Sequence, residues 1–258
     1  MSGTSSVDFM REKIPWLRQS WGQAMLLASS VLPFFGYLSI FWWIDRLHPY
    51  GAVISQLTLS ILECIICYIV MRYMIYRLRD QCKLTHQLPN WAAAFHVAFV
   101  IAPFFALMIH PLMVYGQRLL PIWVAIPSGL FLIVFGLLIR LSAMTGSGFS
   151  LAHAFGVYLV FPEDGLHIDK KVYAYIRHPL SAGVICISIG NGLVRNNIMA
   201  LLIALIYLIP ILLQMKLEDD ELIERFGDLH RCYVKETRSL FPRWRDFRGL
   251  LNLTFFRR

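Results

Sequence analysis

The sequence is short of charged residues for its length. Of its 258 residues, 16% are charged and 57% are hydrophobic, and the mean hydropathy is +0.58. A soluble domain is usually about 25% charged and about 45–50% apolar. A water-soluble chain of this size needs a polar coat, which this composition does not supply. The composition therefore argues against a soluble enzyme, a disordered chain and a disulfide scaffold, and it favours a polytopic membrane protein.

Acidic residues and cysteines are also scarce. The chain has 16 Asp and Glu against 24 Lys and Arg, which gives a formal net charge of +8. In a membrane protein such an excess usually marks basic loops beside anionic lipid rather than a nucleic-acid site. Cys64 and Cys67 form a C-x-x-C inside an apolar run, without a second pair at zinc spacing. We therefore expect no disulfide, no metal site and no nucleic-acid partner.

Long hydrophobic runs, in contrast, are abundant. A spanning helix needs roughly 20 apolar residues, and four runs qualify: 22–44, 51–71, 91–115 and 119–143. A fifth apolar region is interrupted by Arg195-Asn196-Asn197. We predict that its limbs, 180–194 and 198–215, form a helical hairpin whose turn barely reaches, or fails to reach, the far surface, with a kink at Pro210. The predicted fold is an all-α polytopic membrane protein with about six membrane segments.

Basic residues separate by side in a six-segment alternation. All but three of the 24 Lys and Arg fall on one side; Arg46, Arg118 and Arg195 fall on the other. The positive-inside rule places the basic side in the cytosol. We therefore predict that both termini and a helical C-terminal tail are cytosolic, in a bacterial inner membrane or the endoplasmic reticulum. Residues 1–129 would form N-terminal membrane spans, and 130–258 would form the catalytic half.

Polar and turn-forming residues gather in 140–179 and 216–246. Gly146 and Gly148 would let the backbone approach a ligand. His178 precedes Pro179, so we expect an extended residue and a helix that begins at the proline. This places Arg177 and His178 at the positive end of a helix dipole, which suits an anion. A basic collar at the membrane interface explains the segment equally well.

An acidic cluster follows the last apolar run in an otherwise basic tail. The cluster consists of Glu218, Asp219, Asp220 and Glu221. These side chains would hold ribose hydroxyls or an ammonium group, or would pair with the arginines of 225–248. Phe226-Gly227 predicts a helix end with Gly as a left-handed cap. We expect His230 to lie in the solvated tail.

The order of these motifs resembles the isoprenylcysteine carboxyl methyltransferases, in a superfamily that includes the membrane phospholipid N-methyltransferases. The resemblance covers roughly residues 130–243, and it is more specific for the superfamily than for the substrate. It rests on Gly136-x-x-x-Arg140-x-x-Ala143-Met144, on Tyr175-x-Arg177-His178-Pro179-x-x-x-Gly183, and on Glu218-Asp219-x-x-Leu222-Ile223-Glu224-x-Phe226-Gly227 with Tyr233 and Pro242. There are departures: Ser181 and His230 stand where the family has tyrosines.

The resemblance implies S-adenosyl-L-methionine as the cofactor. It places near that cofactor Gly146, Gly148, Tyr175, Arg177, His178, Pro179, Leu180, Gly183 and Glu218. It also implies that Arg140 is catalytic, with Glu218 as a second catalytic candidate. Charge supports Arg140, since a guanidinium fixes a carboxylate by two hydrogen bonds. The alternative for Arg140 is a side chain that snorkels from the end of the fourth span.

The resemblance therefore implies a membrane methyltransferase that acts on the carboxylate of an amphiphile, such as a prenylated cysteine, entering from the bilayer. N-methylation of a phospholipid amine, S-methylation of a small thiol, and a non-catalytic scaffold stay open. A further alternative is an NADPH-dependent membrane sterol-type reductase, because those proteins also carry an Arg-His-Pro segment, a hairpin and a basic tail. Glu63, in the second span, should face the bundle, where it would line a substrate path or bond His96 or Gln56.

Overall fold

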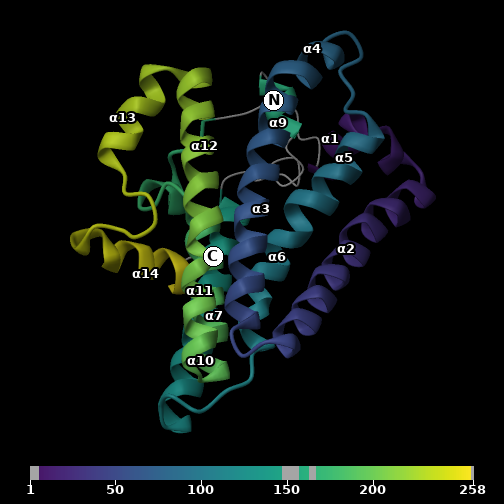
Figure 1. Cartoon of the computed structure of the whole chain (residues 1–258). Coiled ribbons are helices and arrows are strands. Elements are labelled where there is room, and N and C mark those ends of the chain that lie inside the picture. The colour runs from purple at the N-terminus through teal and green to yellow at the C-terminus, as the bar shows by residue number, and fades with distance from the viewer. Residues whose placement is uncertain (1–5, 147–156, 163–166, 257–258) are drawn as a thin grey trace. The chain divides into compact units, whose positions relative to one another are not determined.

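The structure, a computed structural model, describes residues 6–146, 157–162 and 167–256, and the chain there is folded into helices (Figure 1). Within those ranges no β-strand forms; an isolated parallel bridge joins Ile176 and Arg238. The all-α prediction is confirmed. Helical stretches long and apolar enough to cross a membrane are Ser20–Leu47, Gly51–Cys82, Asn90–Leu112, Ile122–Met144 and Ile198–Phe226. The apolar helix Pro179–Arg195 is shorter, so the number of membrane segments stays a prediction.

The predicted apolar runs correspond to the observed helices. The first three form α2 (Ser20–Leu47), α3 (Gly51–Tyr73) with α4 (Arg79–Cys82), and α5 (Asn90–His96) with α6 (Ala102–Ile109). The fourth forms α7 (Ile122–Gly146), and the hairpin forms α10 (Pro179–Arg195), α11 (Ile198–Ile206) and α12 (Leu208–Phe226). The shorter helices are α1 (Ser6–Lys13), α9 (Val157–Val160), α13 (Asp228–Glu236) and α14 (Phe247–Phe256).

The chain divides into two compact units that alternate along the sequence. The first comprises the described parts of 1–40, 62–106 and 148–166, and the second those of 41–61, 107–147 and 167–258. In the first unit Glu63 is 3% exposed, as expected of a carboxyl group that faces inward. The candidate cofactor-site and catalytic residues that the structure describes all lie in the second unit. The functional division at residue 130 stays a prediction.

In the second unit, α7 and α10 pack backbone to backbone. A Cβ atom added to Gly136 would lie 2.5 Å from the carbonyl oxygen of Gly183, and one added to Gly129 would lie 2.7 Å from that of Gly190. The two glycine pairs are two helical turns apart, so the close approach continues along both helices. This packing fixes the side of α7 that faces α10, and Arg140 lies one turn beyond Gly136 on that side.

The hairpin forms as predicted, in two unequal limbs. Asn196 ends α10 in the left-handed conformation (φ 58°, ψ 45°), and the Asn197 side chain caps α11 by accepting a 2.8 Å hydrogen bond from the Ala200 N–H. The second limb breaks at Tyr207, between α11 and α12. Pro210 explains the break, because it has no N–H for the Ile206 carbonyl four residues earlier.

A buried polar cluster of the second unit was not foreseen. His110 Nε2 lies 2.9 Å from Asp45 Oδ2, His110 Nδ1 lies 2.7 Å from Gln56 Oε1, and the ring stacks on Phe41. The cluster ties the end of α2 to α3 and to the turn after α6. All polar atoms in these contacts have partners, so we read the cluster as structural.

Candidate functional site

The start of α10 organises the candidate site. The helix begins at Pro179, as predicted, and His178 is its N-cap residue; its φ of −115° and ψ of 64° lie outside the extended region that was expected. The backbone N–H groups of Arg177 and His178 donate to the carbonyl oxygens of Arg238 (2.8 Å) and Ser239 (3.0 Å). Residues 238–239, which follow α13, therefore lie alongside residues 177–178, on the C-terminal side of the candidate site.

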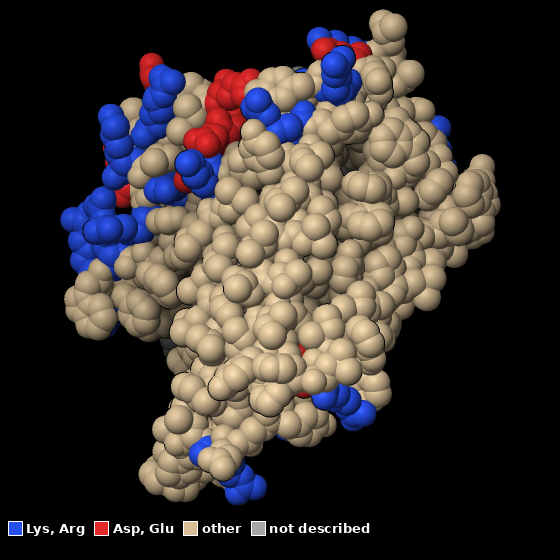
Figure 2. All heavy atoms as spheres, viewed as in Figure 1, with Lys and Arg blue, Asp and Glu red and all other residues tan. Residues whose placement is uncertain are grey.

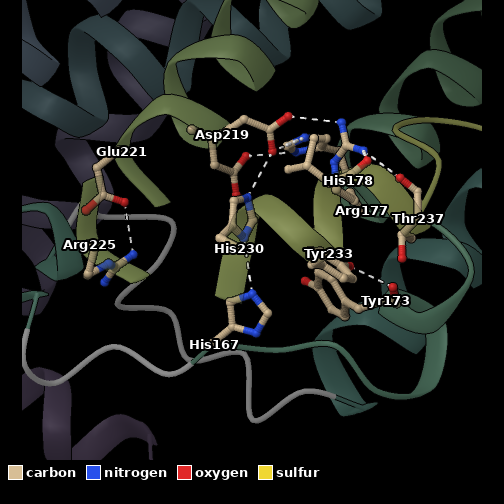
Figure 3. A network of polar contacts seen from close by, with 12 residues as sticks. His167, Tyr173, Arg177, His178, Asp219, Glu221, Arg225, His230, Tyr233 and Thr237 are labelled. Atoms are coloured by element: carbon tan, nitrogen blue, oxygen red, sulfur yellow. Dashed lines mark hydrogen bonds and ion pairs between the residues drawn. The ribbon is translucent and has the colours of Figure 1, made fainter. Parts of the chain in front are cut away.

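Arg177 joins three parts of the second unit. Its guanidinium donates to the carbonyl oxygens of Val234 and Thr237, and Nη2 lies 3.1 Å from Asp219 Oδ2 (Figure 3). Charge-assisted bonds of this kind are stronger than neutral ones. Arg177 thus holds α12, α13 and the following turn together. Its predicted role in cofactor binding stays a prediction.

His178 lies between two carboxylates. Its Nδ1 is 3.3 Å from Glu218 Oε2, and its Nε2 is 3.0 Å from Asp219 Oδ1, an ion-pair contact too bent for a hydrogen bond. Burial opposes the charged imidazolium, but the carboxylates of Asp219 and Glu218 outweigh burial and raise the pKa of His178 to about 9. His178 is therefore a buried cation at neutral pH.

The raised pKa of His178 predicts a loss of stability at alkaline pH. Its folded-state pKa lies above the ordinary value of about 6.5, so the stabilising charge is fully present below pH 6.5 and is lost as the pH rises through 9. We expect the thermal midpoint of the detergent-purified protein to fall across this interval. His178→Gln should flatten the fall, and an unchanged slope in that variant would assign the effect to other groups.

The acidic cluster splits by environment. Asp219 contacts Arg177, His178 and His230, and Glu221 is paired with Arg225 at 2.9 Å. The Glu218 side chain is 50% exposed although it contacts His178. Of these acids, Glu218 therefore combines contact with the buried cation and access from outside. Sequence spacing alone did not rank them.

Arg140 reaches the same helix from α7. Its Nη1 donates a 3.1 Å hydrogen bond to the carbonyl oxygen of Leu180, in the first turn of α10. Its aliphatic stem lies against Gly183, where an added Cβ would be 2.6 Å from Arg140 Cγ. The side chain is half-buried and bonded towards α10, an arrangement that snorkelling does not require.

The remaining predicted residues fall into three groups. Pro179, Leu180 and Gly183 lie in the first turns of α10 beside the contacts above. Tyr175 packs against α14, where an added Cβ on Gly249 would lie 2.8 Å from its ring. Gly146 is the last residue of α7, and Gly148 lies outside the described residues. The cofactor roles of these residues stay predictions.

His230 was placed wrongly from the sequence. It was expected in the solvated tail, but it is 2% exposed and its Nε2 faces Asp219 Oδ1 at 3.4 Å. The reason is Gly227. As predicted, α12 ends at Phe226, but Gly227 has φ 57° and ψ −130°, outside the left-handed helical region that was predicted. Glycine alone reaches positive φ with such a ψ without strain. This turn directs α13 back towards α12, and His230 with it.

His167 is the second unforeseen member of the site. Its Nε2 lies 3.2 Å from His230 Nδ1, and its ring makes edge-to-face contacts with Phe226 and Tyr233. Tyr233 is itself fixed, because its hydroxyl donates to the Tyr173 carbonyl oxygen at 2.7 Å. The only sequence signal for this pair was the departure from the family tyrosine at His230; none pointed to His167.

The donor set suits S-adenosylmethionine. That cofactor carries ribose hydroxyls and an ammonium group, and an exposed carboxylate such as Glu218 accepts hydrogen bonds from both. Figure 2 shows the acidic and basic side chains gathered around the end of α12 and over α13 and α14, beside the apolar surface of the α11–α12 limb.

Comparison with known proteins bears on the same segment. Residues 129–224 match the isoprenylcysteine carboxyl methyltransferase (ICMT) family. The chain is 29% identical over 116 residues to a protein-S-isoprenylcysteine O-methyltransferase of Schizosaccharomyces pombe, over 45% of this chain and 48% of that protein. The chain thus matches about half the length of this curated relative, and no solved structure matches it. The matched residues include Arg140, His178 and Glu218, and the resemblance of the segment from α7 to α12 to the isoprenylcysteine carboxyl methyltransferase family is confirmed.

Proposed function

We propose that this chain is an S-adenosylmethionine-dependent membrane methyltransferase that methylates the carboxylate of an amphiphile, such as a prenylated cysteine. One observation carries the proposal. The guanidinium of Arg140 is bonded to the first turn of α10, and the same helix begins at His178, which contacts Glu218. Arg140, the candidate carboxylate-binding cation, and Glu218, the candidate cofactor-binding acid, thus both contact the start of α10.

The roles follow from charge. Arg140 holds the substrate carboxylate by two hydrogen bonds and orients one oxygen for the transfer. Glu218 binds a ribose hydroxyl or the ammonium of the cofactor. The apolar first turn of α10, with Pro179 and Leu180, follows His178, which Glu218 contacts. S-adenosylmethionine supplies an electrophilic methyl group on a sulfonium. A carboxylate is ionised near pH 7, so no residue has to remove a proton.

The state of the acids favours a carboxylate over an amine. An amine has to lose a proton, which the pair of Glu218 and Asp219, or Glu221, would have to accept. In the structure Asp219 contacts Arg177, His178 and His230, and Glu221 is paired with Arg225. Carboxylates held by cations in this way are poor bases. Glu218 also contacts a cation, His178.

Glu218→Ala should weaken binding of the product analogue S-adenosylhomocysteine by roughly tenfold or more, because a hydrogen bond to a charged group is lost. The measurement is titration calorimetry on the detergent-purified protein. Asp220→Ala is the matched control: it removes an exposed acid from the same helix, and it should bind like the wild type. NADPH, titrated in parallel, should not bind.

Each outcome decides between the classes. Binding of S-adenosylhomocysteine that is lost in Glu218→Ala alone supports the methyltransferase and the role of Glu218. Equal loss in both variants would remove Glu218 from the site. Binding of NADPH without S-adenosylhomocysteine would establish the reductase reading, and binding of neither would favour a scaffold.

A further inference from the structure

A chain of polar contacts leads from a partly exposed histidine to the candidate cofactor site. His167 Nε2 faces His230 Nδ1 at 3.2 Å, His230 Nε2 faces Asp219 Oδ1 at 3.4 Å, and the same oxygen lies 3.0 Å from His178 Nε2 (Figure 3). The members come from three separate segments: the residues that precede α10, which include His167 and His178, helix α12 and helix α13. The proposed function above uses neither His167 nor His230.

The protonation pattern of this chain is directional. An ionised Asp219 only accepts, so His230 must present Nε2–H to it. When His230 is neutral, its Nδ1 is then an acceptor, and His167 must donate from Nε2. The pKa of His167 lies below its ordinary value because the ring is partly buried and faces His230; Arg225 acts in the same direction and Asp169 opposes it. A neutral His167 therefore donates to His230, which donates to Asp219.

Packing fixes the first member of the chain. The His167 ring is held at 5.3 Å from the ring centroids of Phe226, His230 and Tyr233, at interplanar angles of 76–81°. Edge-to-face contacts of this kind restrict the ring to one orientation. Asp219 in turn is the shared partner of Arg177, His178 and His230. Removing the donor at position 230 leaves Asp219 free to rotate towards Arg177 and away from His178.

We propose that His230 is a positioning residue for the cofactor site, with Asp219 fixing its tautomer and His167 donating to its Nδ1. His230 acts through Asp219, which it holds against His178, and it thereby sets the orientation of His178 and Glu218. The inference rests on the proposed function, since the ligand that these residues are positioned for is S-adenosylmethionine.

The test compares binding of S-adenosylhomocysteine in His230→Phe and His230→Gln by calorimetry. Phe keeps a ring but removes both hydrogen bonds, and the affinity should fall roughly tenfold. Gln places an amide N–H near the position of Nε2 and an oxygen near Nδ1, so it should restore most of the affinity. His167→Phe, which keeps the ring in its aromatic surroundings, should cost less than His230→Phe. Cys232→Ser, an exposed change on the same helix, is the control and should match the wild type.

Equal affinity of His230→Phe and wild type would overturn the inference. Binding by His230→Gln as weak as that by His230→Phe would also overturn it, because restored hydrogen-bonding atoms would then have no effect on the affinity. Should the wild type bind no S-adenosylhomocysteine, the proposed function fails, and ¹⁵N spectra of histidine-labelled protein decide the inference alone. His230 is expected to show a protonated Nε2 and an unprotonated Nδ1, and His167→Phe should shift the Nδ1 resonance because that nitrogen loses its donor. A His230 Nδ1 resonance that is the same with and without His167, or a His230 that is protonated at Nδ1 alone, would contradict the chain.

Discussion

Arg140→Ala should reduce turnover of a carboxylate substrate by roughly 100–1000-fold, the usual effect of losing one well-placed charge-stabilising group. The affinity for S-adenosylhomocysteine should change little, since Glu218 and His178 are untouched. The start of α10 is also held against α7 by the close approach of Gly136 and Gly183, so loss of the hydrogen bond from Arg140 to the Leu180 carbonyl should leave the fold intact. The measurement is the initial rate of methyl transfer to a prenylated cysteine, with binding measured on the same preparation.

Two comparisons make the Arg140 result specific. Arg140→Lys keeps a positive charge but loses the planar fork, so it should recover a small part of the rate. A phospholipid amine offered to Arg140→Ala should be methylated as fast as by the wild type if the amine reading is right. Full activity of Arg140→Ala on a carboxylate would remove this residue from the chemistry.

Gly136→Ala and Gly183→Ala should each destabilise the protein by about 1–3 kcal/mol, because neither contact leaves room for a methyl group. The added Cβ would lie 2.5 Å from the Gly183 carbonyl oxygen in the first case, and 2.6 Å from both Arg140 Cγ and the Gly136 carbonyl oxygen in the second. The obstacles are mainly backbone atoms, so α7 and α10 have to separate. Thermal unfolding in detergent measures the cost.

Two further glycines separate the effect on the fold from the effect on the site. Gly190→Ala meets the Gly129 carbonyl oxygen at 2.7 Å, two turns from Gly183, so it should cost similar stability with a smaller loss of activity per folded molecule. Gly36→Ala, where nothing lies within 4 Å, should be neutral. If Gly183→Ala and Gly190→Ala lose activity equally, the contact between Gly183 and Arg140 is not important for turnover.

The sequence predicted features that are written locally in the chain. Long apolar runs marked the helices, Pro179 marked the start of α10, and Pro210 marked the break at Tyr207. Each depends on hydropathy or on the missing N–H of a proline, and these act within a few residues. The same applies to the helix end at Phe226-Gly227.

Features that depend on contacts between distant residues were not predictable in the same way. His230 was misplaced because the direction of α13 is set by ψ of Gly227, and the sequence shows only that a glycine is present. The partners of the acidic cluster depend on how Arg177 and Arg225 are oriented, and those contacts join residues up to 42 positions apart. The His110 cluster likewise needs α2, α3 and α6 to be placed first. The sequence located the candidate site, and the structure ranks its members.

The pairing of residues 177–178 with residues 238–239 has a consequence for the order of assembly during synthesis. The acceptors of the Arg177 side chain in Val234 and Thr237 are 57 and 60 residues further along the chain. At about 5–20 residues per second, the ribosome delivers them some seconds after the arginine. The membrane hairpin is complete before that time, while Arg177 and His178 still lack the tail that covers them. The nascent chain therefore acquires its hydrophobic framework first, and the site closes last, when residue 239 has emerged.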